Sequence, residues 1–147
     1  MQKLFSFLIV MFVSVVSFAQ AYSLRVENQT QCVQYYSIFG DEICKCGNKY
    51  NGAVFAINPG GVHNYSTSVP LLGSYPGTPR SIVGAKILTG PQQCQAAGGI
   101  VGEPPCGLPL IYTYIALNQD CRPCAQTTAR WFPAPNCQGM ARLVFTP

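Results

Sequence analysis

The sequence predicts an all-β fold: a single disulfide-rich antiparallel β-sandwich or barrel with long irregular loops. Three observations support this prediction. Short segments of strand-forming residues alternate with turns, and the chain contains 14 glycines and 12 prolines to make them. Charged residues make up only 10% of the chain, a composition that suits strands and turns better than helices. Eight cysteines provide an even set for cross-linking.

Six segments are predicted strands because they are short, rich in strand-forming residues and bounded by turns. They are residues 22–27, 31–39, 62–69, 81–89, 110–117 and 140–145. The first of them alternates apolar and polar side chains with the two-residue period of a strand that buries one face. Asn51-Gly52 readily adopts the positive φ angles of a tight turn, so we also expect a hairpin there, followed by apolar residues.

Two segments are predicted to be irregular. Residues 70–80 contain three prolines and two glycines, so neither a helix nor a central strand can run through them. Residues 90–109 are interrupted so often by glycine, proline and cysteine that we expect a connection tied by disulfides. The only helical candidate is a short piece at residues 92–97.

The first 21 residues have the features of a secretory signal peptide. Lys3 precedes an apolar run that is shorter than the ~20 residues needed to cross a bilayer, which favours a cleaved leader over an anchor. Ala19-Gln20-Ala21 then supplies the small residues that signal peptidase requires. We expect cleavage after Ala21, with cleavage after Ala19 as the alternative. The predicted domains are therefore the signal peptide, residues 1–21, and one secreted domain, residues 22–147, with no later membrane span.

All eight cysteines follow the predicted leader, and in an oxidising compartment an even set most simply forms four disulfides. They are Cys32, Cys44, Cys46, Cys94, Cys106, Cys121, Cys124 and Cys137. Three precede residues 70–80 and five follow, so complete internal pairing needs an odd number of bridges between the two parts. Cys44 and Cys46 share a face of an extended segment and should reach different partners. The pairing itself stays open.

The CRPC motif at residues 121–124 has the spacing of a redox-active dithiol. In such enzymes the motif follows a strand and opens a helix, whereas here residues 125–137 contain two prolines and another cysteine. A structural role is therefore favoured, with an extracytoplasmic thiol–disulfide oxidoreductase as an alternative function. A zinc site joining the motif to Cys44 and Cys46 is disfavoured, because disulfide formation competes with metal capture outside the cytoplasm.

Other catalytic arrangements are poorly represented. His63 is the only histidine, no G-x-S-x-G motif accompanies it, and the five acidic residues show no pairing suited to glycoside hydrolysis. The cations are scattered, whereas nucleic-acid binding usually needs a clustered basic stripe. We therefore predict no enzyme activity, no cofactor, no bound metal and no nucleic-acid partner.

Binding is the function that the composition favours, because eight tyrosines and one tryptophan supply flat amphipathic side chains. Tyr112 and Tyr114 lie on one face of their strand, so they are either both buried or both presented. With Trp131 they form the predicted binding surface for a protein or carbohydrate, although aromatic residues are also common in cores. The rigid segment 104–109 suggests a second alternative, a disulfide-rich hydrolase inhibitor.

The N-terminal part of the predicted domain carries two further patterns. Asn28 and Asn64 begin NQT and NYS, which match the acceptor pattern for N-glycosylation in a eukaryotic host. The segment VENQTQCVQYYSIF, residues 26–39, resembles the first strand of thaumatin-like sandwiches, where an asparagine precedes an early cysteine. The chain lacks the larger cysteine set and the acidic cleft of that family, so the resemblance implies no fold, activity or site here.

Overall fold

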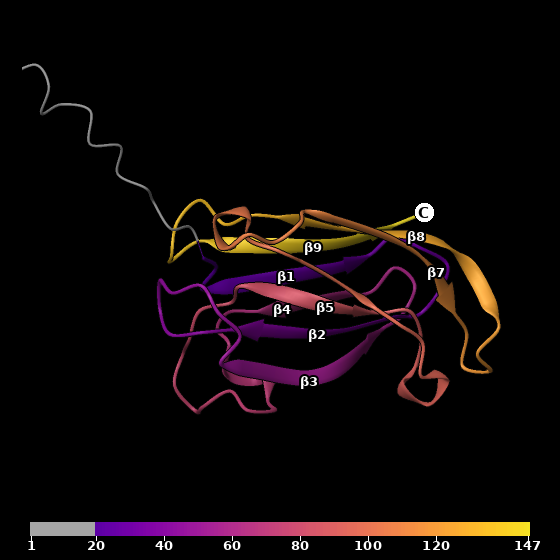
Figure 1. The fold of residues 1–147 in the computed structure, drawn as a ribbon, viewed down its shortest axis with the longest axis horizontal. Coiled ribbons are helices and arrows are strands. Elements are labelled where there is room, and N and C mark those ends of the chain that lie inside the picture. The colour runs from indigo at the N-terminus through magenta and orange to yellow at the C-terminus, as the bar shows by residue number, and fades with distance from the viewer. Residues whose placement is uncertain (1–19) are drawn as a thin grey trace, which may run out of the picture.

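The computed structural model describes residues 20–147, and residues 1–19 of the predicted signal peptide lie outside the described residues. Within this range, a five-stranded sheet in the order β4-β1-β9-β8-β7 packs against a four-stranded sheet in the order β3-β2-β5-β6. Figure 1 shows the yellow β9 and orange β8 on one side of the molecule and the purple β2 and β3 on the other. The predicted fold class, a disulfide-rich β-sandwich, is confirmed.

Short connections separate the strands. In residues 20–147 the strands are β1 Ser23–Asn28, β2 Gln34–Gly40, β3 Tyr50–Ile57, β4 Val62–Tyr65, β5 Gly84–Leu88, β6 Gly99–Gly102, β7 Ile111–Leu117, β8 Pro123–Phe132 and β9 Met140–Thr146. Single 3-10 turns lie at η2 Val69–Leu71, η3 Gln92–Cys94 and η4 Pro104–Cys106. None of these helices in the described part of the chain is long and apolar enough to span a membrane.

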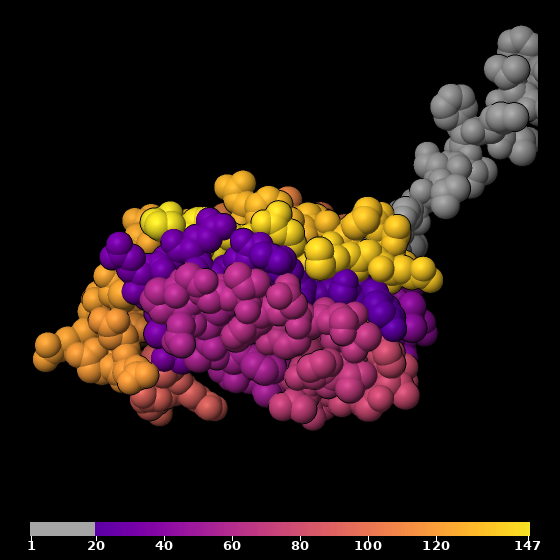
Figure 2. Space-filling view, turned by 180° about the vertical axis from the view of Figure 1, so that it is seen from behind, coloured from indigo at the N-terminus to yellow at the C-terminus, as the bar shows by residue number. Residues whose placement is uncertain are grey.

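The sheets are antiparallel at every pairing except one. β1 pairs in parallel with β9, from Ser23 opposite Met140 to Asn28 opposite Phe145, so the five-stranded sheet is mixed. The predicted antiparallel sandwich thus contains one parallel pairing that the sequence did not indicate. Figure 2 shows the indigo residues of β1 bordering the yellow residues of the C-terminal strand.

Each of the six predicted strands overlaps an observed strand, but the predicted hairpin at Asn51-Gly52 is wrong. Both residues lie inside β3, which pairs with β2. Gly52 serves a close approach between backbones, because a Cβ there would lie 3.0 Å from the carbonyl oxygen of Leu71 and 3.1 Å from that of Ile38. The helical candidate at 92–97 shrinks to the single turn η3, and the segment 90–109 contains the unpredicted strand β6.

The core lies between the two sheets and follows the two-residue period of the strands. On β1, Leu24 and Val26 are buried, and on β9, Leu143 and Phe145 are buried, whereas the residues between them are more exposed or lie on the outer face. Trp131 is among the largest fully buried side chains. Burial of alternate side chains from both sheets is the main stabilising contribution to a sandwich of this kind.

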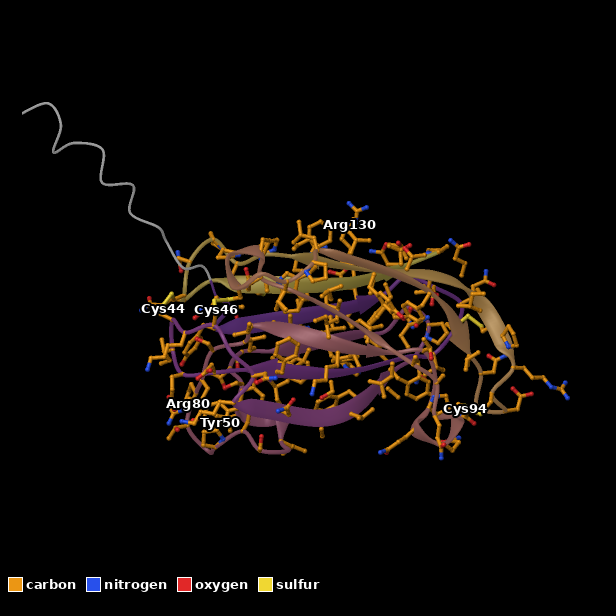
Figure 3. All side chains as sticks on the ribbon, in the orientation of Figure 1. Cys44, Cys46, Tyr50, Arg80, Cys94 and Arg130 are labelled. Carbon is orange, nitrogen blue, oxygen red and sulfur yellow. A yellow bond between two sulfur atoms is a disulfide. The ribbon has the colours of Figure 1, made fainter. Side chains whose placement is uncertain are left out.

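All eight cysteines are bonded, and no free cysteine is found among residues 20–147. The disulfides are Cys32–Cys124, Cys44–Cys137, Cys46–Cys106 and Cys94–Cys121. Cys44 and Cys46 reach different partners, and an odd number of bridges crosses residues 70–80, as predicted. Figure 3 shows Cys44 and Cys46 at one end of the sandwich and Cys94 at the other. Four disulfides are typical of a protein in an oxidising compartment.

The two cysteines of the CRPC motif do not form a dithiol pair. Cys121 is bonded to Cys94, and Cys124 is bonded to Cys32. A redox-active pair must exchange its disulfide within the motif, and these bonds commit each sulfur to a distant segment. The structure therefore assigns this motif a cross-linking role, and the thiolates that the zinc alternative requires are also engaged in disulfides.

Candidate functional site

The aromatic surface predicted from the sequence faces inward. Trp131 is 1% exposed and Tyr114 is 7% exposed. Tyr112 is half-buried, and its ring stacks on that of Tyr114 with centroids 5.5 Å apart. A Cβ on Gly99 would lie 2.4 Å from the Tyr112 ring, so β6 approaches this ring closely. Tyr114 and Trp131 are core residues, and the prediction that they present a binding surface is wrong.

Trp131 also has a polar partner that the sequence did not reveal. Its Nε1–H donates to Oε1 of Glu103 at 3.1 Å, and the backbone N–H of Ala134 donates to the same oxygen at 3.1 Å. Glu103 is fully buried, and its Oε2 has no hydrogen-bond partner in the described structure. Burial raises the pKa of Glu103, and the two N–H donors offset this rise only in part.

The raised pKa of Glu103 predicts a pH dependence of stability. Between the ordinary carboxyl range and the raised folded pKa, the folded state binds more protons than the unfolded state, so stability falls as the pH rises. Replacement of Glu103 by Gln keeps an acceptor for Trp131 and removes the titration. The unaltered protein should therefore lose stability relative to E103Q as the pH rises across this window. The measured quantity is the urea midpoint of E103Q minus that of the unaltered protein, and it should increase with pH. A difference that stays constant with pH would contradict the prediction.

The two glycosylation patterns lie in different environments. Asn28 is 1% exposed, and its Nδ2 donates to the carbonyl oxygens of Cys32 at 2.8 Å and Ile57 at 2.9 Å. A glycan on this nitrogen is incompatible with those contacts, so the prediction for Asn28 is wrong for the folded protein. Asn64 is exposed on the edge strand β4, where its use as an acceptor stays a prediction.

A surface hollow lies on the outer face of the four-stranded sheet. One row of residues crosses all four strands at the same level: Val54 on β3, Ser37 on β2, Lys86 on β5 and Ile100 on β6. Val54 is 46% exposed and Ile100 is 43% exposed, and they lie on the two edge strands of this sheet, on either side of Ser37 and Lys86. We call the hollow along this row the sheet groove.

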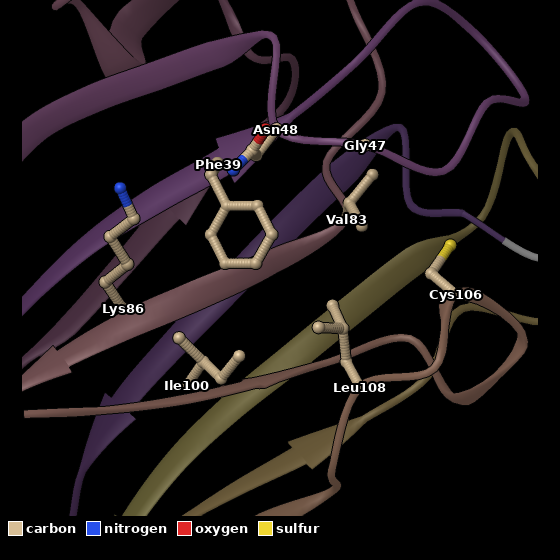
Figure 4. Close-up of a pocket in the computed structure, with 8 residues that line it drawn as sticks. All are labelled: Phe39, Gly47, Asn48, Val83, Lys86, Ile100, Cys106 and Leu108. Atoms are coloured by element: carbon tan, nitrogen blue, oxygen red, sulfur yellow. The ribbon is translucent and has the colours of Figure 1, made fainter.

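The sheet groove consists of two adjoining parts that share Lys86 and Ile100. Their volumes are about 260 Å³ and 650 Å³. The smaller part is lined by Phe39, Gly47, Asn48, Val83, Lys86, Ile100, Cys106 and Leu108. Figure 4 shows these residues, with Lys86 on one side of the hollow and Cys106 on the other. The larger part continues over Val54, Asn51 and the glycines at 98 and 99.

Glycines give the smaller part its depth. Gly84 on β5 and Gly102 on β6 pair two residues along the strands from Lys86, on the same face of the sheet. A Cβ on Gly84 would lie 2.8 Å from the Phe39 ring, and one on Gly102 would lie 2.4 Å from Leu108. Because these positions carry no side chains, the side chains of Phe39 and Leu108 pack directly against the backbone of β5 and β6. The result is an apolar floor instead of a flat strand surface.

Lys86 is the single cation that lines the groove. Its Nζ donates to Oδ1 of Asn51 at 2.6 Å, and it forms no ion pair within residues 20–147. An ammonium carries three donors, so hydrogen atoms remain for a ligand. An anion placed beside this ammonium would gain a charge-assisted hydrogen bond next to apolar walls.

The rim beside Gly47 and Asn48 is held by a charged cluster. Oε1 of Glu42 accepts from Nζ of Lys49 at 2.7 Å and from the hydroxyl of Tyr50 at 2.6 Å, and Nε of Arg80 lies 3.2 Å from Oε2. The Lys49 hydrogen bond, followed by that of Tyr50, lowers the pKa of Glu42 to about 2. Figure 3 shows Arg80 close to Tyr50. The carboxylate therefore stays ionised at neutral pH and fixes this loop.

A disulfide joins the two loops that close the same end of the groove. Cys46 follows Glu42 on the first loop, and its bond to Cys106 reaches η4. Leu108, two residues later, lines the groove. The segment 104–109, which suggested a protease inhibitor, thus supplies a wall of the groove. No cluster of His, Cys, Asp or Glu side chains in the described residues could hold a metal ion.

The groove was missed at the sequence level because its lining comes from distant segments. One signal was present: Lys86 interrupts the apolar strand segment 81–89. A single charged residue in an otherwise apolar strand indicates which face of the sheet is exposed to solvent. Comparisons with models of known protein families, with curated proteins and with solved structures gave no match.

Proposed function

We propose that this protein is a secreted, non-enzymatic binding module that holds an amphiphilic anion in the sheet groove. The ligand class is an apolar chain or ring that carries a carboxylate or sulfonate. The observation that carries the proposal is the Lys86 ammonium, which has no anionic partner in the described structure and lies beside exposed aliphatic side chains.

The apolar part of the ligand would cover Val54 and Ile100. Both side chains are almost half exposed, and covering them removes apolar area from water at roughly 25 cal/mol per Å². The groove volumes lie near the range of about 300–1,000 Å³ that is common for small-molecule sites. The oxygen atoms of the ligand would accept from Lys86, and Ser37 and Asn51 offer further polar contacts at the groove floor.

The rigid frame supports binding at low entropic cost. The Cys46–Cys106 disulfide and the Glu42 cluster fix the loops at one end, and β-strands supply the remaining lining. A preformed groove avoids the ordering cost that a flexible loop pays on association. All eight cysteines among the described residues are bonded, which favours function in an oxidising compartment. The predicted leader would direct the chain to such a compartment.

The proposal predicts that decanoate binds and that replacement of Lys86 by Gln weakens binding about tenfold, the worth of one charge-assisted hydrogen bond at a partly exposed site. Decanoate is titrated into the protein, and binding is measured by calorimetry and by the amide chemical shifts of β5 and β6. Decyltrimethylammonium has the same apolar chain with the opposite charge and should bind more weakly than decanoate.

Arg130 supplies a matched control. It is an exposed cation without an ion pair in the described structure, and it lies on the outer face of the other sheet, where Figure 3 shows it pointing away from β8. Replacement of Arg130 by Gln changes the net charge equally and should leave decanoate binding unchanged. Equal losses in the two variants, or shifts confined to residues outside the groove, would overturn the proposal.

A further inference from the structure

Gln20 and Ala21, which the sequence assigned to the leader, belong to the folded domain. Both residues are 0% exposed, and Ala21 is part of the hydrophobic core. Ala21 forms an antiparallel bridge with Ile82: its N–H donates to the Ile82 carbonyl at 3.0 Å, and the Ile82 N–H donates back at 2.8 Å. These residues therefore continue the path of β1 into the sandwich.

The side chain of Gln20 is held as well. Its Nε2 donates to Sγ of Cys46 at 3.3 Å and lies 3.6 Å from Sγ of Cys106. Its Oε1 accepts from the hydroxyl of Ser81 at 3.4 Å. Gln20 thus fills the space beside the disulfide that joins the two loops of the sheet groove.

Removal of the two residues would leave buried groups without partners. Ile82 is 0% exposed, and both its backbone N–H and its carbonyl are bonded to Ala21, so loss of Ala21 breaks two backbone hydrogen bonds at the core edge. An unpaired buried backbone group costs about as much as a lost hydrogen bond, and here two would be unpaired. A chain that began at Tyr22 would also lose the Gln20 contacts to the Cys46–Cys106 disulfide.

We infer that the leader is cleaved between Ala19 and Gln20, so that Gln20 is the first residue of the mature protein. Ser17-Phe18-Ala19 offers signal peptidase the same small-x-small pattern as Ala19-Gln20-Ala21. The peptidase adds one water across the Ala19–Gln20 peptide bond, which leaves a carboxylate on Ala19 and an α-amine on Gln20. This inference rests on the secretion in the proposed function and is independent of the groove ligand.

The test is the N-terminus of the protein secreted from the full chain with its own leader. Intact mass and tandem mass spectrometry should give a first peptide that begins at Gln20, either as glutamine or lighter by one ammonia if the α-amine has displaced the side-chain amide nitrogen. A first peptide that begins at Tyr22, or a retained leader, overturns the inference.

Two variants test the position of the cut separately from folding. Leucine is too large for the residue immediately before the cut. Replacement of Ala21 by Leu should still allow leader removal, whatever its effect on folding, because Ala21 belongs only to the alternative site Ala19-Gln20-Ala21. Replacement of Ala19 by Leu should block leader removal and serves as the positive control, because Ala19 is a small residue of both sites. Loss of leader removal in the Ala21 variant overturns the inference. Leader removal is read from the size of the chain in the secreted and cell-retained fractions.

A comparison of the two mature forms provides a second readout. Protein that begins at Gln20 should unfold at a higher temperature than protein that begins at Tyr22, and equal midpoints would overturn the structural basis of the inference. Titration of decanoate into the Gln20 form reports on the groove alone. Failure of decanoate to bind would therefore refute the proposed function without changing the result at the N-terminus.

Discussion

Replacement of Cys32 and Cys124 by alanine is expected to lower the free energy of unfolding by about 4.5 kcal/mol, because this disulfide closes a long loop in the unfolded chain. The two cysteines are 92 residues apart in sequence. Cys32 precedes β2 in the four-stranded sheet and Cys124 lies in β8 of the five-stranded sheet, so the bond also joins the two layers. Urea unfolding of the double variant measures the loss.

The Cys94–Cys121 disulfide is the matched comparison. Its sequence separation is 27, so its removal should cost about 3.5 kcal/mol by the same entropic argument. Cys32 is 2% exposed, whereas Cys121 is exposed, and truncation in the core adds to the larger loss. If the Cys94/Cys121 variant lost more free energy of unfolding than the Cys32/Cys124 variant, loop length would not determine which disulfide stabilises the protein more.

Replacement of Trp131 by alanine is expected to cost about 4 kcal/mol, in the range found for large aromatic residues in cores. Within residues 20–147, Trp131 is the largest of the fully buried side chains, and its loss leaves a cavity. The variant also removes one of the two donors to Oε1 of the buried Glu103. Chemical denaturation followed by circular dichroism measures the change.

Phe132 is the natural control for Trp131, because the next residue on a strand faces the opposite side. Phe132 is 40% exposed, and its ring contacts the guanidinium of Arg142 at 5.3 Å. Its replacement by alanine should cost about 1 kcal/mol, mainly through that contact. Similar losses at the two positions would contradict the assignment of Trp131 to the core.

The strand β8 shows why part of the fold could not be predicted. Its sequence, PCAQTTARWF, begins with a proline and mixes small, polar and charged residues, so no strand was expected there. The structure places Pro123 at the first position of the strand, where a missing N–H is tolerated. β8 pairs with both β7 and β9, so its conformation depends on partners that a local pattern does not contain.

The cysteines could be interpreted from local sequence patterns, whereas the sheet groove could not. The number of cysteines and the spacing of Cys44 and Cys46 were enough to predict complete bonding with separate partners. The row from Val54 to Lys86 and Ile100 depends on the register of three strand pairings. Strand order and register are properties of the assembled sheet, so a binding surface made from several strands was beyond local patterns.

The parallel pairing of β1 with β9 has a consequence for the order of folding. The first and last strands of the sandwich are neighbours near the middle of the five-stranded sheet, and β4 and β8 pair on their other sides. This sheet therefore cannot close until the C-terminal strand has been synthesised. Contacts between residues so far apart in sequence also form slowly. The topology itself delays folding until the whole chain is available, and three of the four disulfides join segments at least 60 residues apart that the same assembly brings together.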